Sequence, residues 1–529
     1  MSEKNPDAER SRPAPHPMNE TNLGSLLYSG QFVLGPSFVE NLSGWQRLSI
    51  GSALQITAHP ALSLCHRSDG NRSLTLIGYI VDPDQVNATD LDVVDKLLGK
   101  YSSIQELINA TFRFGGRWVL IAQDGNRRYL FNDPLGLRQA FYTDTVCTDN
   151  DLWVMSQTGM GAELLGLTMD PSSRDYMEWR MSQGHHEYMW PGTTSPFREI
   201  LHLLPNHYLD INTGRCHRFW PRERLEQISL DEAIDRVADR MPRLLEAAVN
   251  RFDLALGLTA GLDSRLVLAA SKAISERISY ISVQNVMMHA EHADLTVPAN
   301  ILQKLGLRHD VIVARSAMSP AFRQVYEKSI MAAHAHYGPN AEAILGHYGR
   351  TKAAVTGSGS EICREELRLG LPLLERRPSP EFLAMRHLGG LHPFTMQSLR
   401  GWCERVPHNH GIHPLDLFEW EQGCGNWLAM TQLEFSIAWR EIFTPFNCRT
   451  VLTTLLAIPA RYRMAPDYTI YNALIGRLWP EVMTEPINPH KEQSQGNRYW
   501  RAMKFLTKYG VSRALYRLRG ARHARHNAQ

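Results

Sequence analysis

The sequence predicts an α/β protein with two domains, a β-rich domain followed by a domain built on a parallel sheet. The chain has 529 residues, which is too long for one ordinary hydrophobic core. Short apolar runs separated by turn residues fill the stretch from about 23 to 222. From residue 228, strands and helices alternate, and this alternation is typical of a parallel sheet with crossover helices.

Composition and charge limit the class of protein. The hydrophobic content is 43% and the charged content is 21%, as in ordinary globular proteins. The net charge of +2 gives no reason to expect nucleic acid or a membrane as a partner. The 7 cysteines are scattered without a CxxC pair, which favours a reducing, cytoplasmic environment over disulfides or zinc. We expect no membrane span, because no apolar run is long enough.

The two ends of the chain are expected to lie outside the domains. Residues 1–22 are polar and rich in proline, which is typical of a disordered tail and not of a signal peptide. Residues 511–529 are rich in arginine, and we expect a solvated helix that frays into a basic tail. The predicted domains therefore cover 23–222 and 228–510.

The first domain is predicted to contain strands that form a layered β-rich sandwich. The runs Leu74–Val81 and Arg117–Ala122 are each followed by turn residues. Another run, Arg128–Asn132, follows the turn at 123–126, so this pair predicts a hairpin. One helix is expected at about 90–101, after a polar turn.

The second domain is predicted to begin with a helix. Ser229 and Glu232 form a capping box, and apolar residues then recur at helical spacing. The elements predicted after it are the strand Leu254–Leu258, a helix from Ser264, the strand Ile278–Val283, a helix at about 294–305, the strand His309–Val313 and the strand Lys352–Thr356. A ligand of such a sheet binds beyond the carboxyl ends of the strands, which is where the turn at 259–264 lies.

The turn Thr259–Ser264 is the strongest candidate for a binding site. A strand, a turn of small residues and a helix N-terminus together form an anion site, because backbone N–H groups point outward there. Asp263 is placed where a divalent cation would bridge it to phosphate oxygens, and the hydroxyls of Thr259 and Ser264 can donate to those oxygens. Taken alone, these residues also fit a structural turn with a helix cap.

This turn resembles the pyrophosphate-binding loop of the ATP pyrophosphatase superfamily, whose usual form is Ser-Gly-Gly-x-Asp-Ser. Further segments resemble those of asparagine synthetases and follow the order of that family. They are Asp294–His309, Ala354–Ile362, Glu441–Phe446 and Pro489–Gln493. Each motif is weak, but their joint order identifies the chain as similar to the asparagine synthetase superfamily.

The first domain is similar to the glutaminase domain of those enzymes in the segments Phe114–Leu120 and Asn132–Gly136. The resemblance implies an αββα sandwich of the N-terminal-nucleophile (Ntn) hydrolase class. The chemistry of that class needs a cysteine at the mature N-terminus, where the α-amine acts as its base. Residue 2 is Ser2 and the first cysteine is Cys65, so we expect a degenerate domain without glutaminase activity.

The resemblance also implies ligands and roles for the second domain, which would be an ATP-pyrophosphatase domain with a helical C-terminal part. ATP is expected to bind at Gly257, Thr259, Ala260, Gly261, Leu262, Asp263, Ser264, Val283, Gly357 and Ser358, and Mg²⁺ at Asp263 and Glu361. Lys491 is expected to stabilise the developing charge during catalysis, and Glu441 is the second expected catalytic residue.

The expected function is ATP-dependent formation of an amide bond. By the resemblance, a carboxylate is adenylated with release of pyrophosphate, and an amine then attacks the acyl carbon and displaces AMP. β-Lactam synthetases, carbapenam synthetases and lasso-peptide cyclases are similar to this chain in lacking the glutaminase nucleophile. The expected substrates are an amine and the carboxylate of an amino acid, a peptide or a sugar acid, and a homodimer is one option for the assembly.

The sequence leaves alternatives open. Within the ligase class they are glutamine- or ammonia-dependent amidation, ring closure of a β-amino acid, and macrolactam formation on a peptide. Thr259 and Ala260 replace Ser and Gly of the family, Ser358 replaces Glu or Tyr, and Glu361 replaces Asp. Serine is a poor general base at neutral pH. These departures keep a second class open, a non-catalytic relative that binds only a nucleotide or a partner.

Overall fold

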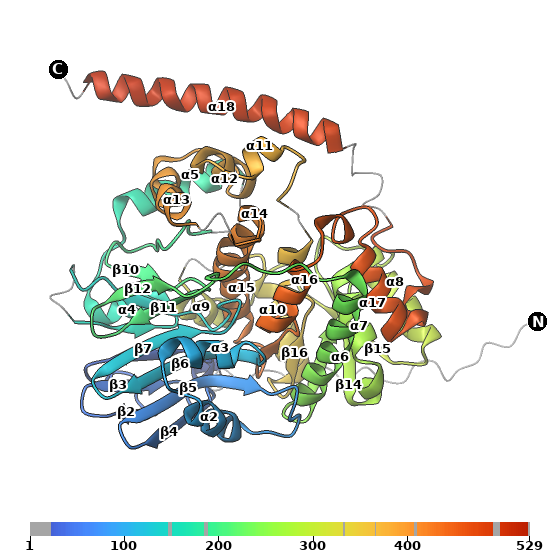
Figure 1. Ribbon diagram of the computed structural model, residues 1–529, viewed down its shortest axis with the longest axis horizontal. Helices are drawn as coiled ribbons and strands as arrows, with labels where there is room; N and C mark the ends of the chain where they lie inside the picture. Colours follow the sequence, from blue (N-terminus) through green and yellow to red (C-terminus); the bar gives the residue numbers. More distant parts are fainter. Residues whose placement is uncertain are drawn as a thin grey trace, which may run out of the picture.

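The computed structural model describes residues 23–146, 151–184, 189–331, 334–364, 367–406, 410–489 and 498–526, with side chains of the last helix described for 500–518. Three sheets organise this part of the chain, two antiparallel sheets of six strands and one parallel sheet of five. Figure 1 shows the antiparallel strands, in blue to green, beside the half that holds the parallel sheet. The predicted α/β class is confirmed.

The two antiparallel sheets stack as a sandwich. The strand order of the first sheet is β10 (Ile200–His202), β8 (Phe141–Thr143), β9 (Val154–Met155), β1 (Phe32–Gly35), β3 (Leu54–Ala58) and β2 (Gln46–Ile50). The order of the second is β12 (Arg215–Arg218), β11 (His207–Asp210), β7 (Arg127–Asn132), β6 (Gly115–Asp124), β5 (Arg72–Val81) and β4 (Leu64–Asp69). Strands β6 and β7 form the predicted hairpin.

Alternation of side chains along the strands produces four layers. In β6, Val119 and Ile121 belong to an apolar cluster shared with the first sheet, whereas Trp118 and Leu120 belong to the cluster on the opposite face. That opposite face is covered by α2 (Asp90–Gly99) and α3 (Ile104–Thr111), and the outer face of the first sheet by α4 (Thr158–Leu165). The order of the layers is therefore helix, sheet, sheet, helix, which is the order that the resemblance implied.

The parallel sheet confirms the alternating pattern of the second half. Its strand order is β15 (His309–Val313), β14 (Ile278–Gln284), β13 (Leu254–Gly257), β16 (Ala353–Val355) and β17 (Ile442–Phe443). The first four of these lie within two residues of the predicted strands. The fifth, β17, has only two residues and was not predicted, because so short a run has no measurable periodicity.

Helices cover both faces of the parallel sheet. On one face Leu254, Leu256 and Val355 share a cluster with residues of α6 (Leu230–Val249), α7 (Leu262–Ala270), α8 (Ala293–Lys304), α16 (Arg449–Leu456) and α17 (Thr469–Leu478). On the other face Ala255, Ile281 and Ala354 share a cluster with residues of α9 (Pro320–Ser329) and α10 (Gly338–Tyr348). Burial on both faces explains why β13 and β16 are short continuous apolar runs.

The other helices lie mostly between residue 360 and the C-terminus. They are α5 (Pro171–Ser182), α11 (Pro372–Glu375), α12 (Pro380–His387), α13 (Pro393–Arg405), α14 (Pro414–Phe418), the π-helix η5 (Glu419–Leu428), α15 (Ala429–Phe435) and α18 (Arg498–His526), with the 3₁₀ turns η2 (Gly24–Leu26), η3 (Lys272–Arg277), η4 (Ser360–Cys363), η6 (Ala460–Tyr462) and η7 (Pro480–Thr484). The predicted boundary between 510 and 511 falls inside α18. The described helices include none that is both long enough and apolar enough to span a bilayer.

The sandwich and the parallel-sheet domain are joined by buried polar contacts. The side-chain amide of Asn447 donates to the carbonyl of Gly116 at 2.6 Å and to Asp133 at 2.9 Å, and its oxygen accepts the N–H of Leu135 at 2.9 Å. The hydroxyl of Tyr79 donates to the carbonyl of Ile442 at 2.8 Å. Because all of these groups are buried, leaving one without its partner would destabilise the joined domains.

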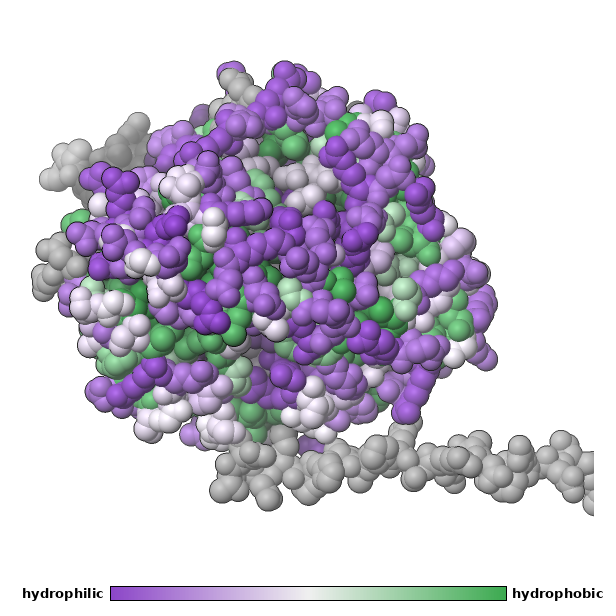
Figure 2. All heavy atoms as spheres, turned by 60° about the horizontal axis from the view of Figure 1, so that its bottom comes forward, coloured by the Kyte–Doolittle hydropathy of each residue, from purple (hydrophilic) through white to green (hydrophobic). Residues whose placement is uncertain are grey.

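The surface is mixed in character on the side that lies at the bottom of Figure 1. Figure 2 shows hydrophilic side chains over most of that face, with apolar side chains scattered among them. Scattered apolar residues of this kind are normal for a soluble surface and mark no particular site.

Candidate functional site

A cavity of about 350 Å³ lies at the carboxyl ends of β13, β14 and β16. Its size is within the range of about 300–1,000 Å³ that is usual for small-molecule sites. The lining residues are Gly257, Leu258, Thr259, Asp263, Ser264, Ile281, Ser282, Val283, Met288, Asp294, Thr356, Gly357, Ser358 and Glu361. The predicted position of the site, beyond the strand ends, is the position of this cavity.

The first turn connects β13 to α7 and is held by its own hydroxyls. The N–H of Thr259 donates to the Ser264 hydroxyl at 3.2 Å, and the N–H of Gly261 donates to the Thr259 hydroxyl at 3.1 Å. The N–H of Ala260 donates to Asp294 Oδ1 at 2.8 Å. An anion at this site would therefore meet the N-terminal turn of α7, whose N–H groups have no partner within the helix, more directly than the N–H groups of 259–261.

The second turn follows β16 and packs directly on the first. A Cβ atom added to Gly357 would lie 2.6 Å from the backbone carbon of Asp263 and 2.8 Å from its Cβ. No side chain fits at that separation, so position 357 requires glycine. Gly359 has φ of 98°, which turns the chain into η4 and presents Glu361. Two segments almost a hundred residues apart thus converge on one cavity.

The two acids expected to hold magnesium are linked by an arginine. Arg364 Nη2 lies 3.1 Å from Asp263 Oδ2 and 3.9 Å from Glu361 Oε1. The other oxygen of Asp263 accepts a hydrogen bond from the Ser360 hydroxyl, and Glu361 Oε2 accepts the N–H of Gly359 at 2.7 Å. A cationic group therefore already contacts both carboxylates.

The donor set fits a metal that binds together with a polyphosphate. The lining contains three carboxylates, Asp263, Asp294 and Glu361, and these would repel phosphate groups unless a cation lay between them. Among the described residues, no group of three or more His, Cys, Asp or Glu side chains could hold a metal without further ligands. Mg²⁺ commonly takes one or two carboxylates and completes its coordination with phosphate oxygens and water, which is what Asp263 and Glu361 could provide.

Buried groups beneath the cavity fix both turns. The hydroxyl of Tyr471, in α17, donates to the carbonyl of Ser360 at 3.1 Å, and burial raises the pKa of Tyr471 well above its usual value. The guanidinium of Arg265 donates to the carbonyl of Pro486 at 2.9 Å, and burial lowers the pKa of Arg265 to about 10, so it stays charged at neutral pH. The N–H of Asn488 donates to the carbonyl of Ala260 at 3.1 Å. The segment at 486–488 is thus attached to the first turn.

The predicted ligand residues fall into three groups. Gly257, Thr259, Asp263, Ser264, Val283, Gly357, Ser358 and Glu361 line the cavity. Ala260, Gly261 and Leu262 belong to the same turn but do not line it, and Ala260 and Leu262 are buried beneath it. Lys491 lies outside the described residues, two positions after the last one before the gap.

Glu441 lies away from this cavity. Its carboxylate is 2.9 Å from Arg138 Nη2 and 3.9 Å from Arg117 Nη1, and both arginines are 2% exposed. Arg117 is in β6 and Arg138 follows β7, so the ion pair joins the sandwich to the parallel-sheet domain. This placement gives no support to the catalytic role expected for Glu441, and its contacts are those of a structural interdomain ion pair.

The sequence did not single out several residues that matter here. Asp294 was noted only as part of a motif, and its contact with Ala260 could not be inferred because the two lie on different elements. Ser360 was noted only as part of the segment Ala354–Ile362, and Arg364 was not among the predicted site residues. Ser282 has no motif, and only the register of β14 beside β13 brings it to the cavity. Met288 has no motif either and reaches the cavity from the turn after β14.

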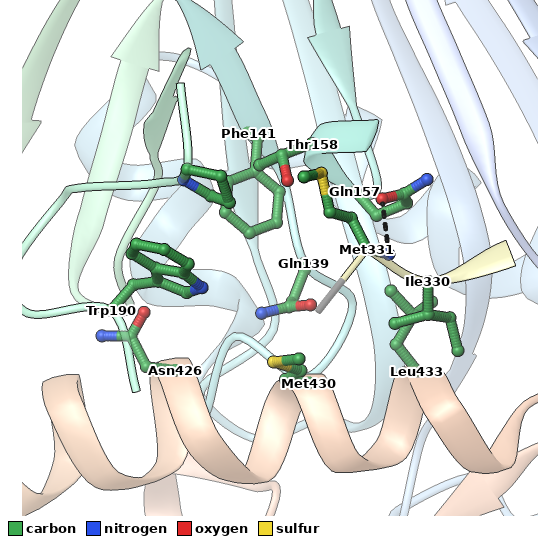
Figure 3. Close-up of a pocket in the computed structure, with 11 residues that line it drawn as sticks. Gln139, Phe141, Gln157, Thr158, Trp190, Ile330, Met331, Asn426, Met430 and Leu433 are labelled. Atoms are coloured by element: carbon green, nitrogen blue, oxygen red, sulfur yellow. Dashed lines mark hydrogen bonds between the residues drawn. The ribbon is translucent and has the colours of Figure 1, made fainter. Parts of the chain in front are cut away.

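A second, much smaller cavity lies where the sandwich meets the helices of the other domain. Its volume is about 30 Å³, enough for about two water molecules. Figure 3 shows Gln139, Gln157 and Asn426 around it, with Phe141 and Trp190 to one side. The oxygen of Gln157 accepts the N–H of Met331 at 3.4 Å, the dashed contact of Figure 3. The cavity is too small for a glutamine side chain with its backbone.

Four of the described cysteines are unsuited to act as a nucleophile. Cys65 is buried in β4, and burial raises its pKa to about 11. Burial likewise raises the pKa of Cys216 and of Cys363 to about 12, and that of Cys448 to about 11. Because the thiolate is the reactive form, these thiols are inert at neutral pH.

Comparisons with known proteins add little. No family model matches the chain, and no curated protein matches it. One similar solved structure is glutamine phosphoribosylpyrophosphate amidotransferase from B. subtilis complexed with ADP and GMP, at 12% identity over 65% of this chain and 74% of that chain, with a TM-score of 0.23. Another is the allosteric regulatory enzyme of purine biosynthesis, at 14% identity over 58% and 76%, with a TM-score of 0.24. At these TM-scores neither likeness carries an argument.

Proposed function

We propose that this chain is an ATP-dependent ligase that forms amide bonds in the manner of asparagine synthetases. The observation that carries the proposal is the convergence of two turns, at 259–264 and 356–361, on one acid-lined cavity at the carboxyl ends of a parallel sheet. Both turns were singled out by their similarity to the same family. A chance pair of structural turns has no reason to share a cavity.

The cavity provides the groups that a nucleoside triphosphate needs. The N-terminal turn of α7 and the hydroxyls of Thr259 and Ser264 would bind phosphate oxygens. Val283, with the backbone of Gly257 and Gly357, would bind the adenine. Magnesium held by Asp263 and Glu361 would neutralise charge on the leaving pyrophosphate. Arg364 would then exchange its contact with Asp263 for one with the phosphates, since a guanidinium binds phosphate as readily as carboxylate.

The reaction proposed for the site has two steps. The substrate carboxylate attacks the α-phosphorus of ATP, which forms an acyl-adenylate and releases pyrophosphate. An amine then attacks the acyl carbon and AMP departs, and most of the rate comes from holding the two groups together. Lys491 is proposed to stabilise the oxyanion. The residues at 486–488 attach the chain that leads to Lys491 to the first turn.

We further propose that the amine does not come from glutamine hydrolysed by the same chain. Ser2 lies outside the described residues, and burial raises the pKa of Cys65, the first cysteine of the chain, to about 11. The cavity of about 30 Å³ beside the sandwich is too small for glutamine. The amine would be a free substrate or a group on the carboxylate substrate itself. The proposal therefore includes β-lactam formation, macrolactam formation and ammonia-dependent amidation as alternatives for the reaction.

The proposal is tested by product analysis. Purified full-length protein with magnesium and ATP is screened against mixtures of amino acids, peptides and sugar acids with amines. We expect pyrophosphate and AMP in equal amounts when a substrate pair is present. Formation of ADP and phosphate instead would contradict adenylation, and the Asp263→Asn variant serves as the inactive control.

A second candidate, a non-catalytic nucleotide-binding relative, is favoured by one contact. Arg364 contacts both acids that would hold the metal. Ser358 stands where the family has Glu or Tyr, and serine is a poor general base. Calorimetry with ATP, with and without magnesium, separates the two candidates. Tight binding of ATP that does not depend on magnesium and gives no products with any substrate pair would favour the second.

A further inference from the structure

The last helix, α18 (Arg498–His526), has a composition unlike the rest of the chain. It contains no aspartate and no glutamate. Its nine basic residues are Arg498, Arg501, Lys504, Lys508, Arg513, Arg517, Arg519, Arg522 and Arg525. Since the whole chain has a net charge of only +2, the remainder of the chain is net acidic and the positive charge is concentrated here.

One face of α18 packs against the rest of the protein. Ala502 and Tyr509 are buried, the Phe505 ring lies 5.4 Å from the ring of Phe382, and the Tyr509 hydroxyl lies 3.3 Å from the hydroxyl of Ser379. These contacts are all made to α12 and the residue before it. The attachment therefore fixes the helix against the surface and leaves the opposite face outward.

The outward face is apolar. Its exposed large side chains are Trp500, Met503, Val511, Leu515 and Leu518, with exposed fractions of 68%, 40%, 57%, 52% and 61%. At 100° per residue these positions fall on one stripe, opposite to Ala502, Phe505 and Tyr509. These five make up a large share of the exposed large apolar side chains in the described part of the chain.

The surroundings of this stripe indicate the kind of partner that covers it. Lys508 lies along one side of the stripe and Arg517 along the other, and Lys504 lies within the stripe, between the positions of Val511 and Leu515. Positive charge therefore accompanies the apolar side chains on both sides. Figure 1 shows α18 along the outer edge of the molecule, above α5 and α12, and nothing is drawn beyond it. A helix in this position can lie flat on a plane over its whole length.

We propose that α18 binds the surface of a bilayer that contains anionic lipids. The stripe would enter the boundary between headgroups and acyl chains, and the flanking lysines and arginines would reach the lipid phosphates with their charged ends. An acidic protein would need a groove shaped for the helix, whereas a membrane needs only the flat access that α18 has. The proposal departs from the expectation of no membrane partner, which was based on the charge of the whole chain.

The test is co-sedimentation of the full-length protein with vesicles. One set is phosphatidylcholine alone and the other is phosphatidylcholine mixed with phosphatidylglycerol. We expect the protein to pellet with the mixed vesicles, to stay in the supernatant with phosphatidylcholine alone, and to be released by high salt, because salt screens the attraction to the headgroups. Neither ATP nor a substrate is needed, so the result does not depend on the proposed ligase activity.

Matched variants identify the surface responsible. The variant Val511→Ser with Leu515→Ser and Leu518→Ser should lower the partition coefficient at least about tenfold. Val313→Ser with Leu373→Ser removes apolar side chains that are 62% and 94% exposed elsewhere, and it should leave binding unchanged. Circular dichroism and thermal unfolding verify that both variants are folded.

Three outcomes would overturn the proposal. They are failure of the wild type to bind the mixed vesicles, equal loss of binding in the control variant, and equal binding to phosphatidylcholine alone. A protein that does not bind vesicles, and whose dimer is dissociated by the triple variant, would show that a second copy of the chain covers the stripe. If the stripe binds an acidic protein and not a bilayer, the wild type should fail to bind the mixed vesicles, which is the first of these outcomes.

Discussion

The two domains use their acidic side chains differently. In the parallel-sheet domain, Asp263 and Glu361 face a cavity of about 350 Å³. In the sandwich, Asp133 accepts hydrogen bonds from the backbone of Trp118, Leu137 and Arg138 and from Asn447, and burial raises its pKa in spite of them. The nearby cavity is about 30 Å³. The comparison teaches that the motif Asn132–Gly136, although similar to a glutaminase segment, works here as part of the domain junction.

The largest effect is expected from Asp263→Asn, which tests whether chemistry belongs to the parallel-sheet domain alone. Loss of the carboxylate should lower the rate of pyrophosphate release by about a thousandfold. The proposed Mg²⁺ would lose one of its ligands and would no longer neutralise the charge on the departing pyrophosphate. The melting temperature should change little. Asp253→Asn is the control, since that exposed carboxylate pairs with Lys352 at 2.7 Å and should contribute little.

The next largest effect is expected from Glu441→Ala. It tests whether Glu441 has a structural role at the domain junction. Glu441→Ala leaves the charge of Arg138 buried without a carboxylate partner, so the free energy of unfolding should fall by about 3 kcal/mol. The KM for ATP should stay the same. The double variant Glu441→Leu with Arg138→Met should recover most of the stability. A folded Glu441→Ala protein that is fully stable but inactive would show that this residue is catalytic after all.

Histidine burial in the sandwich predicts a pH dependence of stability. Burial lowers the pKa of His202 to about 4, whereas in the unfolded chain it is about 6.5. Between these values His202 binds more protons in the unfolded state, so its contribution to stability falls as the pH falls below about 6.5, by about 2 kcal/mol at pH 5. Denaturant unfolding of the wild type and of His202→Gln, at about pH 6.5 and at about pH 5, measures this contribution. An unchanged slope in the variant would show that another group is responsible.

Gly357→Ala sharpens the comparison by separating the two turns of the proposed site. The new methyl group would meet the backbone of Asp263, and the free energy of unfolding should fall by about 1–3 kcal/mol. Affinity for ATP should fall as well, because Asp263 must move. Gly346→Ala, in α10 with open space around it, should be neutral or slightly stabilising. Calorimetry and thermal unfolding measure both variants.

The smallest effect is expected from Arg364→Gln. Removal of a guanidinium that competes for Asp263 should lower the magnesium concentration needed for half-maximal ATP binding, by about three- to tenfold. Arg368→Gln is the control, because Arg368 pairs with Asp416 away from the cavity. A rise in the magnesium requirement would instead indicate that the contact of Arg364 with the phosphates outweighs its competition for Asp263.

The sequence predicted the fold well where periodicity was strong. The strands at 254–258 and 278–283 and the helix at 90–101 are present within two residues, because burial on both faces or on one face leaves a clear pattern. The two-residue strand β17 has no pattern to detect.

The candidate site was predicted in part. The turns were found because small residues, a hydroxyl and an acid follow an apolar strand in each. The contact of Gly357 with Asp263 and the position of Arg364 depend on packing between segments far apart in sequence. Glu441 lies in a segment that resembles a family motif, and the sequence could not show that its side chain faces an arginine of the other domain. Its catalytic role stays a prediction.

The apolar cluster on the face of β6 that points away from the first sheet has a consequence for the evolution of the protein. Trp118 and Leu120, from the sandwich, share it with Leu244 and Leu256, which support the parallel sheet. A domain whose side chains complete its neighbour's interior cannot be deleted without exposing that interior to water. Selection would therefore retain the sandwich long after any reaction of its own had disappeared, and expression of the second domain alone should yield an insoluble product.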